Sequence, residues 1–167
     1  MAMTIDAAFE AAKLKVGEVS RQEFGRISRK EFQRFAVAVD DLNPLYFSDE
    51  VANKVNRTGV VAPPLFLTSV MGWRSGPPNE QLKGDGTEGS ETGGLSLGGL
   101  RLMGGGQDIE FHQEVRDNVE VISEASLDSV ELKEGSSGRF LIIKILRRYF
   151  DRAGFELLTC RETFIAR

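Results

Sequence analysis

Residues 119–166 have the sequence VEVISEASLDSVELKEGSSGRFLIIKILRRYFDRAGFELLTCRETFIA, and this stretch decides the fold. It holds three segments rich in Val, Ile, Leu, Phe and Thr, at 119–132, 139–151 and 155–166, which the short connections KEGSSG and DRAG separate. This composition and spacing predict three long β-strands joined by hairpins. Neither face of the last segment is purely polar, so we expect one face to pack on a helix and the other partly on a partner.

A very apolar segment precedes these strands. The sequence LFLTSVMGW at 65–73 follows Pro63 and Pro64 and is apolar on nearly every side, which predicts a buried helix with prolines at its start. A fourth strand is predicted at about 107–114. Long antiparallel strands after one apolar helix indicate an α+β fold, in which a curved antiparallel sheet wraps around that central helix.

Two further helices are predicted nearer the amino terminus. Ser28 and Glu31 have the spacing of a capping box, so a helix should begin there. Apolar residues then recur at the helical spacing i, i+3, i+4 and i+7, and the helix should end before Asn43 and Pro44. A shorter helical turn is predicted from Ser48, because two acidic residues follow it in the position that the helix dipole favours.

Glycine is concentrated between the two halves of the chain. Twelve of the 18 glycines lie between Gly72 and Gly106, and residues 77–94 have almost no apolar side chain. This composition predicts a flexible Gly-rich insertion at about 75–98 inside one domain that covers residues 1–167. We expect the insertion to act as a lid or as an interface segment.

Composition excludes several classes of function. The 167 residues include 21 basic and 25 acidic side chains, a net charge of −4, so no broad positive field is available for a nucleic-acid partner. One cysteine, Cys160, and one histidine, His112, cannot form an internal disulfide or a usual zinc site, and no metal or cofactor is expected. The first residues contain acids and no long apolar run, so we expect no signal peptide, no membrane span and a cytoplasmic location.

Three isolated features leave alternatives open. His112 would have to serve any Ser-His-Asp or Cys-His mechanism on this chain, but its position in a strand favours a structural histidine. Cys160 is expected to be a small buried apolar group. Arg147, Arg148 and Arg152 are predicted to form a basic cluster, either binding phosphates or lying in a solvated turn.

Three stretches resemble the MaoC-like dehydratases, which have the hot-dog fold and hydrate 2-enoyl thioesters of coenzyme A or acyl carrier protein. They are FAVAVDDLNPLY at 35–46, GVVAPPLF at 59–66 and GGGQDIEFHQEVRDN at 104–118. The first is similar to the helix that leads into the family pattern Gly-Asp-x-Asn-Pro-x-His, and the second to the start of the central helix. The third is similar to a strand and turn that usually end in Arg-Pro-Gly-Asp. The resemblance spans nearly the whole chain.

The resemblance implies a mechanism, and the chain departs from it at two positions. In the family an Asp and a His five residues later activate a water, and a backbone amide at the start of the central helix holds the enolate oxygen. Asp41 matches the Asp, but Tyr46 stands at the histidine, and a tyrosine with a pKa near 10 is a poor base. Pro64 stands at the amide donor and has no N–H. Asp41 therefore either survives as an acid or only ends the helix, and Tyr46 is either a substrate hydrogen-bond donor or a packed aromatic.

The hypothesis is a non-catalytic subunit of an enoyl-thioester hydratase. The chain is most similar to the amino-terminal half of double-hot-dog hydratases and to subunits of heteromeric 3-hydroxyacyl-thioester dehydratases. The resemblance implies a partner that carries the Asp/His dyad, with coenzyme A or pantetheine present only as part of the acyl thioester. The alternatives are a homodimeric hydratase that uses Asp41 with Tyr46 or His112, and a thioester-binding module without chemistry. Expected substrate-binding residues are Asn43, Pro44, Ala62, Pro63, Pro64, Leu65, Phe66, Met71 and Trp73.

Overall fold

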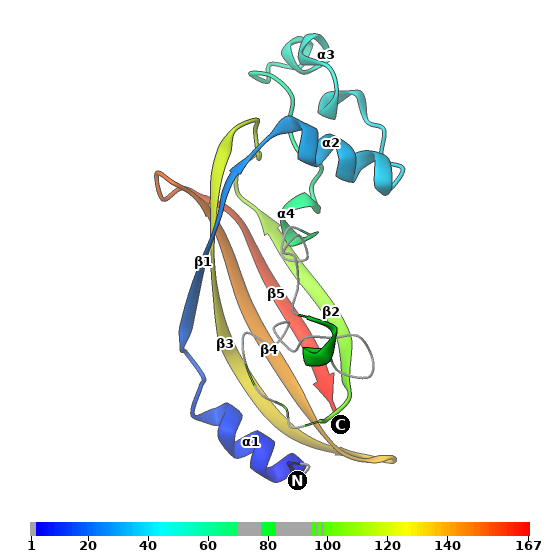
Figure 1. Cartoon of the computed structure of the whole chain (residues 1–167), viewed down its shortest axis with the longest axis vertical. Helices are drawn as coiled ribbons and strands as arrows, with labels where there is room; N and C mark the ends of the chain where they lie inside the picture. Colours follow the sequence, from blue (N-terminus) through cyan, green and yellow to red (C-terminus); the bar gives the residue numbers. More distant parts are fainter. Residues whose placement is uncertain (1–2, 70–77, 83–94, 96, 98) are drawn as a thin grey trace.

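The computed structural model describes residues 3–69, 78–82, 95, 97 and 99–167. A five-stranded antiparallel sheet with the order β1-β3-β4-β5-β2 dominates it, and the strands are long and curved (Figure 1). The α+β arrangement predicted from the sequence is confirmed. The strands are β1 (Val19–Ile27), β2 (Leu102–Phe111), β3 (Val119–Gly135), β4 (Gly138–Asp151) and β5 (Glu156–Ala166).

The three hairpin strands agree with the prediction, whereas β1 and the limits of β2 do not. β1 was not predicted, because this edge strand has the polar sequence VSRQEFGRI and its alternation is broken by a bulge between Glu23 and Gly25. The fourth strand was predicted at about 107–114, but β2 begins at Leu102. It therefore includes three glycines, which strands generally disfavour.

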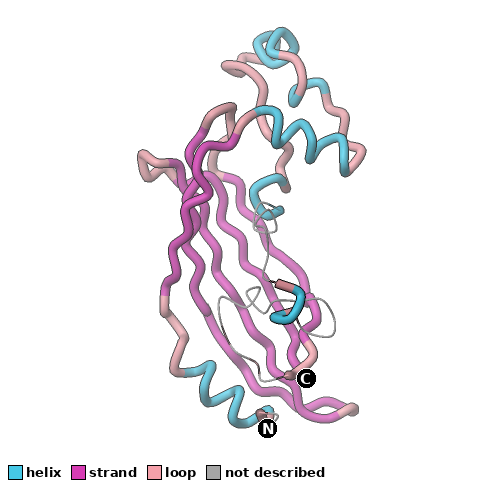
Figure 2. The backbone as a smooth tube through the Cα atoms, in the orientation of Figure 1, coloured by secondary structure: helices cyan, strands magenta, loops and turns pink. Residues whose placement is uncertain are grey.

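Helices lie at both ends of the sheet, as Figure 2 shows. α1 (Ile5–Lys13), which was not predicted, buries Ala8 and Ala12 against one end of the sheet. α2 (Arg29–Ala38) begins with the predicted capping box, in which the Ser28 amide donates to Glu31 Oε2 at 2.6 Å. The short helix η1 (Pro44–Tyr46) and α3 (Asp49–Lys54) follow, and Ser48 caps α3 as predicted.

The structure describes only the first residues of the segment that was predicted as the central helix. α4 (Phe66–Ser69) begins after the two prolines, and Phe66 and Leu67 are buried. Most of the predicted insertion at 75–98, together with Met71 and Trp73, lies outside the described residues. Another short helix, η3 (Asn79–Gln81), lies within that stretch.

One face of the sheet, here called the inner face, packs against α1 and α4. Its side chains come from alternate positions of β3, β4 and β5 and form two buried clusters, one beside each helix. Cys160 belongs to the cluster beside α4 and is 1% exposed, so the prediction of a small buried apolar group is confirmed. In the described part of the chain, no helix has both the length and the apolarity needed to cross a bilayer.

Arg29 links the helices to the sheet. Its Nε donates to Asp117 Oδ2 at 2.9 Å, and its two terminal nitrogens donate to Asp49 at 2.9 and 3.0 Å. Asp117 precedes β3 and Asp49 opens α3, so one side chain joins three segments. The guanidinium lowers the pKa of the Asp49 carboxyl below its usual value, chiefly through these hydrogen bonds.

Candidate functional site

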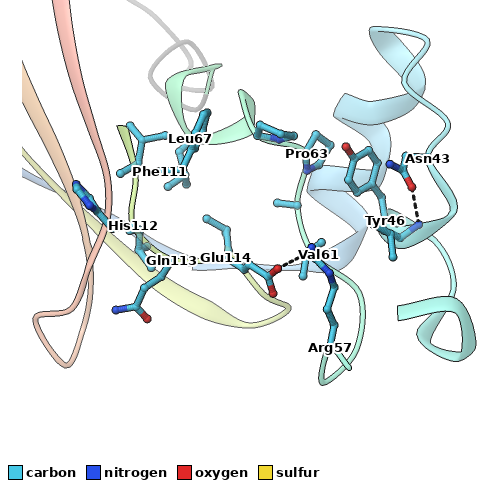
Figure 3. A pocket seen from close by; sticks show the side chains of 16 residues that line it. Asn43, Tyr46, Arg57, Val61, Pro63, Leu67, Phe111, His112, Gln113 and Glu114 are labelled. Carbon is cyan, nitrogen blue, oxygen red and sulfur yellow. Dashed lines mark hydrogen bonds and ion pairs between the residues drawn. The ribbon is translucent and has the colours of Figure 1, made fainter. Parts of the chain in front are cut away.

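A pocket of about 370 Å³ lies between the helical segment and the turn that follows β2 (Figure 3). Most of its wall is apolar, and most of its polar groups lie on two loops that approach it from opposite sides. The residues that line it are Asn43, Leu45, Tyr46, Arg57, Val61, Ala62, Pro63, Pro64, Leu67, Phe111, His112, Gln113, Glu114, Val115, Leu157 and Leu158.

The two sides of the pocket are joined at its edge. Arg57 forms an ion pair with Glu114, and the Ala62 amide donates to the Val115 carbonyl at 2.8 Å. An isolated β-bridge between Val61 and Arg116 continues this connection. The loop before α4 and the turn after β2 are therefore joined at this edge by a backbone hydrogen bond and a β-bridge as well as by an ion pair.

The two positions that match the family dyad lie in contact. Tyr46 OH donates to Asp41 Oδ2 at 3.2 Å, and the tyrosine is 6% exposed. Burial, and secondly the charge of Asp41, raise the pKa of Tyr46 above its usual value. Tyr46 therefore stays neutral at physiological pH, where it donates to Asp41 and has no basic form available.

Backbone geometry explains where these two residues lie. α2 ends in a Schellman motif: Asp40 has φ of 57°, its amide donates to the Val37 carbonyl, and the Asp41 amide donates to the Ala36 carbonyl at 2.9 Å. The backbone of Asp41 thus ends the helix while its side chain remains available to Tyr46. The Tyr46 carbonyl in turn accepts from Gln33 Nε2 at 2.9 Å, which fixes η1 against α2.

The segment before α4 offers no free amide at three consecutive positions. The Ala62 N–H is donated to the Val115 carbonyl, and Pro63 and Pro64 have no N–H. An enolate oxygen placed at these positions would meet no backbone donor. The sequence indicated that Pro64 offers no amide donor. In the structure, the amide of Ala62 is not available either.

His112 lies at the rim of the pocket and belongs to a separate hydrogen-bonded chain. Its Nε2 lies 2.8 Å from Thr159 Oγ1, and that hydroxyl donates to Glu156 Oε1 at 2.6 Å. Arg148 donates to both oxygens of Glu156, at 2.9 and 2.7 Å, and lowers the pKa of that carboxyl to about 2. Because the Thr159 hydrogen is used, the network assigns the proton of His112 to Nε2.

The predicted substrate-binding residues separate into four groups. Asn43, Ala62, Pro63 and Pro64 line the pocket, as does Tyr46. Pro44 and Leu65 are exposed and lie outside the lining, and Phe66 is buried in the core. Met71 and Trp73 lie outside the described residues. Sequence reasoning did not single out Arg57, Phe111, Gln113 or Glu114, although three of them lie in the family-like stretch 104–118.

The predicted basic cluster is wrong. Successive side chains of a strand point to opposite faces, so Arg147 lies on the inner face with Glu162 while Arg148 lies on the outer face with Glu156. Arg152 lies in the following turn and pairs with Glu120. Within the described ranges, no three His, Cys, Asp or Glu side chains come together as a metal site would require.

Comparisons with known proteins identify the family and the fold of this chain. The family model FAS1-like, dehydratase domain region matches residues 15–159. A UPF0336 protein of Streptomyces coelicolor is 25% identical over 135 residues, which are 81% of this chain and 80% of that protein.

Solved structures with the same fold include a chain of the ChsH1-ChsH2 complex from Mycobacterium tuberculosis, with a TM-score of 0.76. That chain is 16% identical, and the match covers 97% of this chain and 92% of that chain. A chain of the HadBC (3R-hydroxyacyl-ACP dehydratase) complex from the same organism has a TM-score of 0.69, 18% identity and 99% coverage of both chains. The (R)-hydratase from A. caviae has a TM-score of 0.63 and 20% identity, and covers 90% of this chain and 95% of that chain. This chain therefore belongs to the FAS1-like dehydratase-region family, and its fold is the hot-dog fold of the MaoC-like dehydratases.

Proposed function

We propose that this chain is the non-catalytic subunit of an enoyl-thioester hydratase, or 3-hydroxyacyl-thioester dehydratase, and shapes the acyl pocket of an active partner. The contact between Tyr46 and Asp41 carries the proposal: the group at the histidine position donates a hydrogen bond to the acid that it would have to assist. A dyad needs an acceptor there. The absence of a free amide at 62–64 supports the same conclusion.

A second hot-dog subunit would supply the missing dyad. Two of the structures that share the fold are complexes whose names join two components, ChsH1-ChsH2 and HadBC. The apolar wall formed by Val61, Leu67, Phe111 and Leu158 suits an acyl chain that extends from a partner's active site. Coenzyme A or acyl-carrier pantetheine enters only as part of the substrate.

The test combines this chain with a MaoC-like subunit that has an intact Asp and His. We expect no hydration of crotonyl-CoA or 2-decenoyl-CoA by this chain alone. The mixture should hydrate both, with kcat/KM for the longer substrate raised above that of the partner alone. Full activity of this chain alone would overturn the proposal, as would a mixture that behaves like the partner alone.

Substitutions separate this proposal from a self-sufficient hydratase. The observation that favours the alternative is that Tyr46 and His112 line the same pocket. In a self-sufficient enzyme, Asp41→Asn or His112→Gln should lower turnover by about 10²–10⁴-fold. In the complex that we propose, neither substitution lowers kcat by that much, and Tyr46→His creates no activity because the amide donor is still missing. Thioester binding without turnover in any mixture would instead indicate a binding module.

A further inference from the structure

Two buried hydrogen-bond donors on β4 have no partner among the described residues: Arg147 Nη2 and Tyr149 OH. Arg147 is 6% exposed and Tyr149 is fully buried. Most buried side-chain donors in native proteins are paired, because an unpaired one loses its water without recovering a hydrogen bond. Two such donors close together therefore point to an acceptor that is not part of these segments.

The two donors lie on the same face of the central strand. Arg147 and Tyr149 are two positions apart on β4, so both side chains lie on the inner face. Their neighbours across the sheet on β5 are Cys160 and Leu158, respectively. Burial is the dominant influence on the Tyr149 hydroxyl and raises its pKa, while the nearby charge of Arg147 lowers it to a smaller extent. The phenol thus keeps its proton and remains a donor.

The charge of Arg147 is already balanced. Its Nε donates to Glu162 Oε2 at 3.0 Å, and Gln107 Nε2 donates to the other oxygen of that carboxylate at 3.0 Å. With the guanidinium and the carboxylate paired, a bound anion would leave a net negative charge in a buried site. By charge, the acceptor that suits both donors is a neutral oxygen, such as a carbonyl or a hydroxyl.

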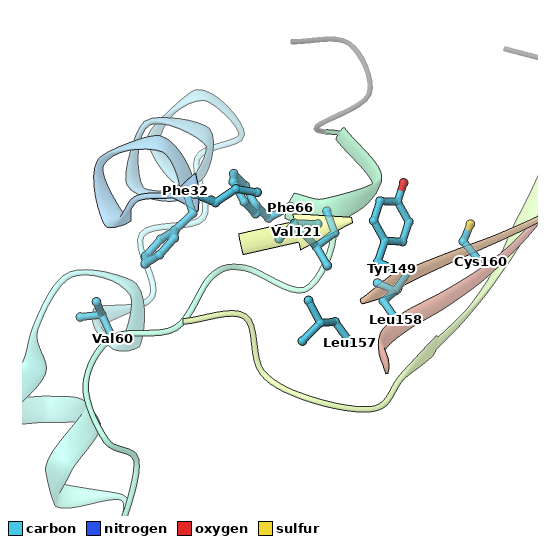
Figure 4. Close-up of a cluster of buried hydrophobic side chains, with 10 residues drawn as sticks. Phe32, Val60, Phe66, Val121, Tyr149, Leu157, Leu158 and Cys160 are labelled. Carbon is cyan, nitrogen blue, oxygen red and sulfur yellow. The ribbon is translucent and has the colours of Figure 1, made fainter. Parts of the chain in front are cut away.

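The two donors lie next to the pocket wall, although neither of them lines the pocket. Leu158 lies opposite Tyr149 on one side and opposite Phe111 on the other, and Leu158 and Phe111 both line the pocket. Tyr149 also packs in the same buried cluster as Leu67 and Leu157, two further residues of the pocket wall. Figure 4 shows Tyr149 beside Leu157 and Leu158. Beyond Arg147 the inner face of β4 becomes apolar, at Ile145, Ile143 and Leu141.

We propose that Arg147 and Tyr149 bind an oxygen atom on the acyl chain, so that the site favours acyl thioesters that carry a keto or hydroxyl group beyond the reacting carbons. This inference rests on the proposed function, because it takes the pocket to be an acyl pocket. It specifies the substrate class: an oxygenated chain in preference to a plain hydrocarbon chain.

The experiment measures binding to the 167-residue chain by isothermal titration. The probes are dodecanoyl-CoA and a series of dodecanoyl-CoA derivatives that carry one oxo group at carbon 6, 8 or 10. We expect at least one oxo probe to bind about tenfold more tightly than the plain probe, the difference that one neutral hydrogen bond supplies. Tyr149→Phe should reduce this preference, so that the oxo probe and the plain probe bind with nearly equal affinity.

Matched variants keep the test decisive. Arg147→Met should also reduce the preference, but it can unfold the chain, so Tyr149→Phe is the primary variant. Arg161→Met is the control, because Arg161 is exposed and lies on the outer face of β5, and it should retain the full preference.

Each outcome tests either the oxygen-binding inference or the hydratase proposal. Equal affinity for oxo and plain probes, or an unchanged preference in Tyr149→Phe, overturns the inference and leaves the hydratase proposal intact. A mixture with no activity gain overturns the hydratase proposal while the binding preference is still measurable on this chain. Binding of no probe at all by this chain overturns the inference, and the activity of the mixture then tests the hydratase proposal separately.

Discussion

Arg147 and Arg148 are neighbours in the sequence and differ in almost every physical respect. Arg147 lies on the inner face, where its side chain and that of its partner Glu162 are 7% and 12% exposed. Arg148 lies on the outer face, where its side chain and that of Glu156 are 43% and 24% exposed. Each is opposite a different residue of β5: Cys160 faces Arg147 and Thr159 faces Arg148.

The difference shows that burial, and not residue type, sets what an ion pair does in this fold. The outer pair is solvated, and through Thr159 it orients His112 at the pocket rim. The inner pair has given up most of its water and still leaves one guanidinium nitrogen unpaired. Such a pair adds little net stability but is costly to break, because the remaining charge is buried.

Removal of the inner arginine should have the largest effect on stability. Arg147→Met leaves the Glu162 carboxylate buried without its cation, and we expect the free energy of unfolding in urea to fall by about 3–5 kcal/mol. The double variant Arg147→Met/Glu162→Met should recover most of this loss, because no lone charge remains. A loss under about 1 kcal/mol for the single variant would show that water reaches the carboxylate.

Removal of the outer arginine should have a smaller effect. Arg148→Met breaks the two hydrogen bonds to Glu156, but both groups keep access to water, so we expect a loss of about 1 kcal/mol in the same urea measurement. If Arg148→Met proved as destabilising as Arg147→Met, the contrast between the two faces would be wrong.

The pH dependence of stability sharpens the same comparison. Arg148 lowers the pKa of Glu156 from its ordinary 4.5 to about 2 in the folded protein. The stability that the lowered pKa of Glu156 contributes should therefore be fully present above pH 4.5 and be lost as the pH falls through about 2. Urea unfolding between pH 2 and 5 should show this slope, and Glu156→Gln should flatten it. An equal slope in both proteins would contradict the lowered pKa.

Cys160 lies opposite Arg147 on the inner face, so the reactivity of its thiol reports whether solvent reaches that face. Burial raises the pKa of this thiol to about 11, and the thiolate is the reactive form. We expect iodoacetamide to label the native protein slowly at pH 8, and much faster in urea. A Cys160→Ala protein with Arg161→Cys, which is exposed on the outer face, should react rapidly even when folded. Equally fast labelling of both native proteins would mean that the inner face is open.

The elements that could be predicted were those with local signals. The three hairpin strands, the capping box at Ser28 and the cap at Ser48 depend on residues within a few positions of each other. β1 was missed because an edge strand needs few apolar residues, and its pairing with β3 joins segments about 100 residues apart.

The candidate site divides in the same way. Asp41 and Tyr46 are five residues apart, and the motif indicated both. The contacts between His112 and Thr159 and between Arg57 and Glu114 join residues 47 and 57 positions apart, and no local pattern connects them. The basic cluster was wrongly predicted for a different reason. Arg147 and Arg148 are adjacent in the sequence, but successive side chains of a strand point to opposite faces of the sheet.

The contacts of Arg29 have a mechanical consequence for the pocket. One wall of the pocket belongs to the loop after α3 and the other to the turn before β3, and Arg29 joins these regions through Asp49 and Asp117, with Arg57 and Glu114 as a second tie. Every one of these charges is at least partly exposed, so dissolved ions can screen it. Higher ionic strength should therefore weaken these ion pairs, while the uncharged backbone hydrogen bond from Ala62 to Val115 keeps the two walls joined.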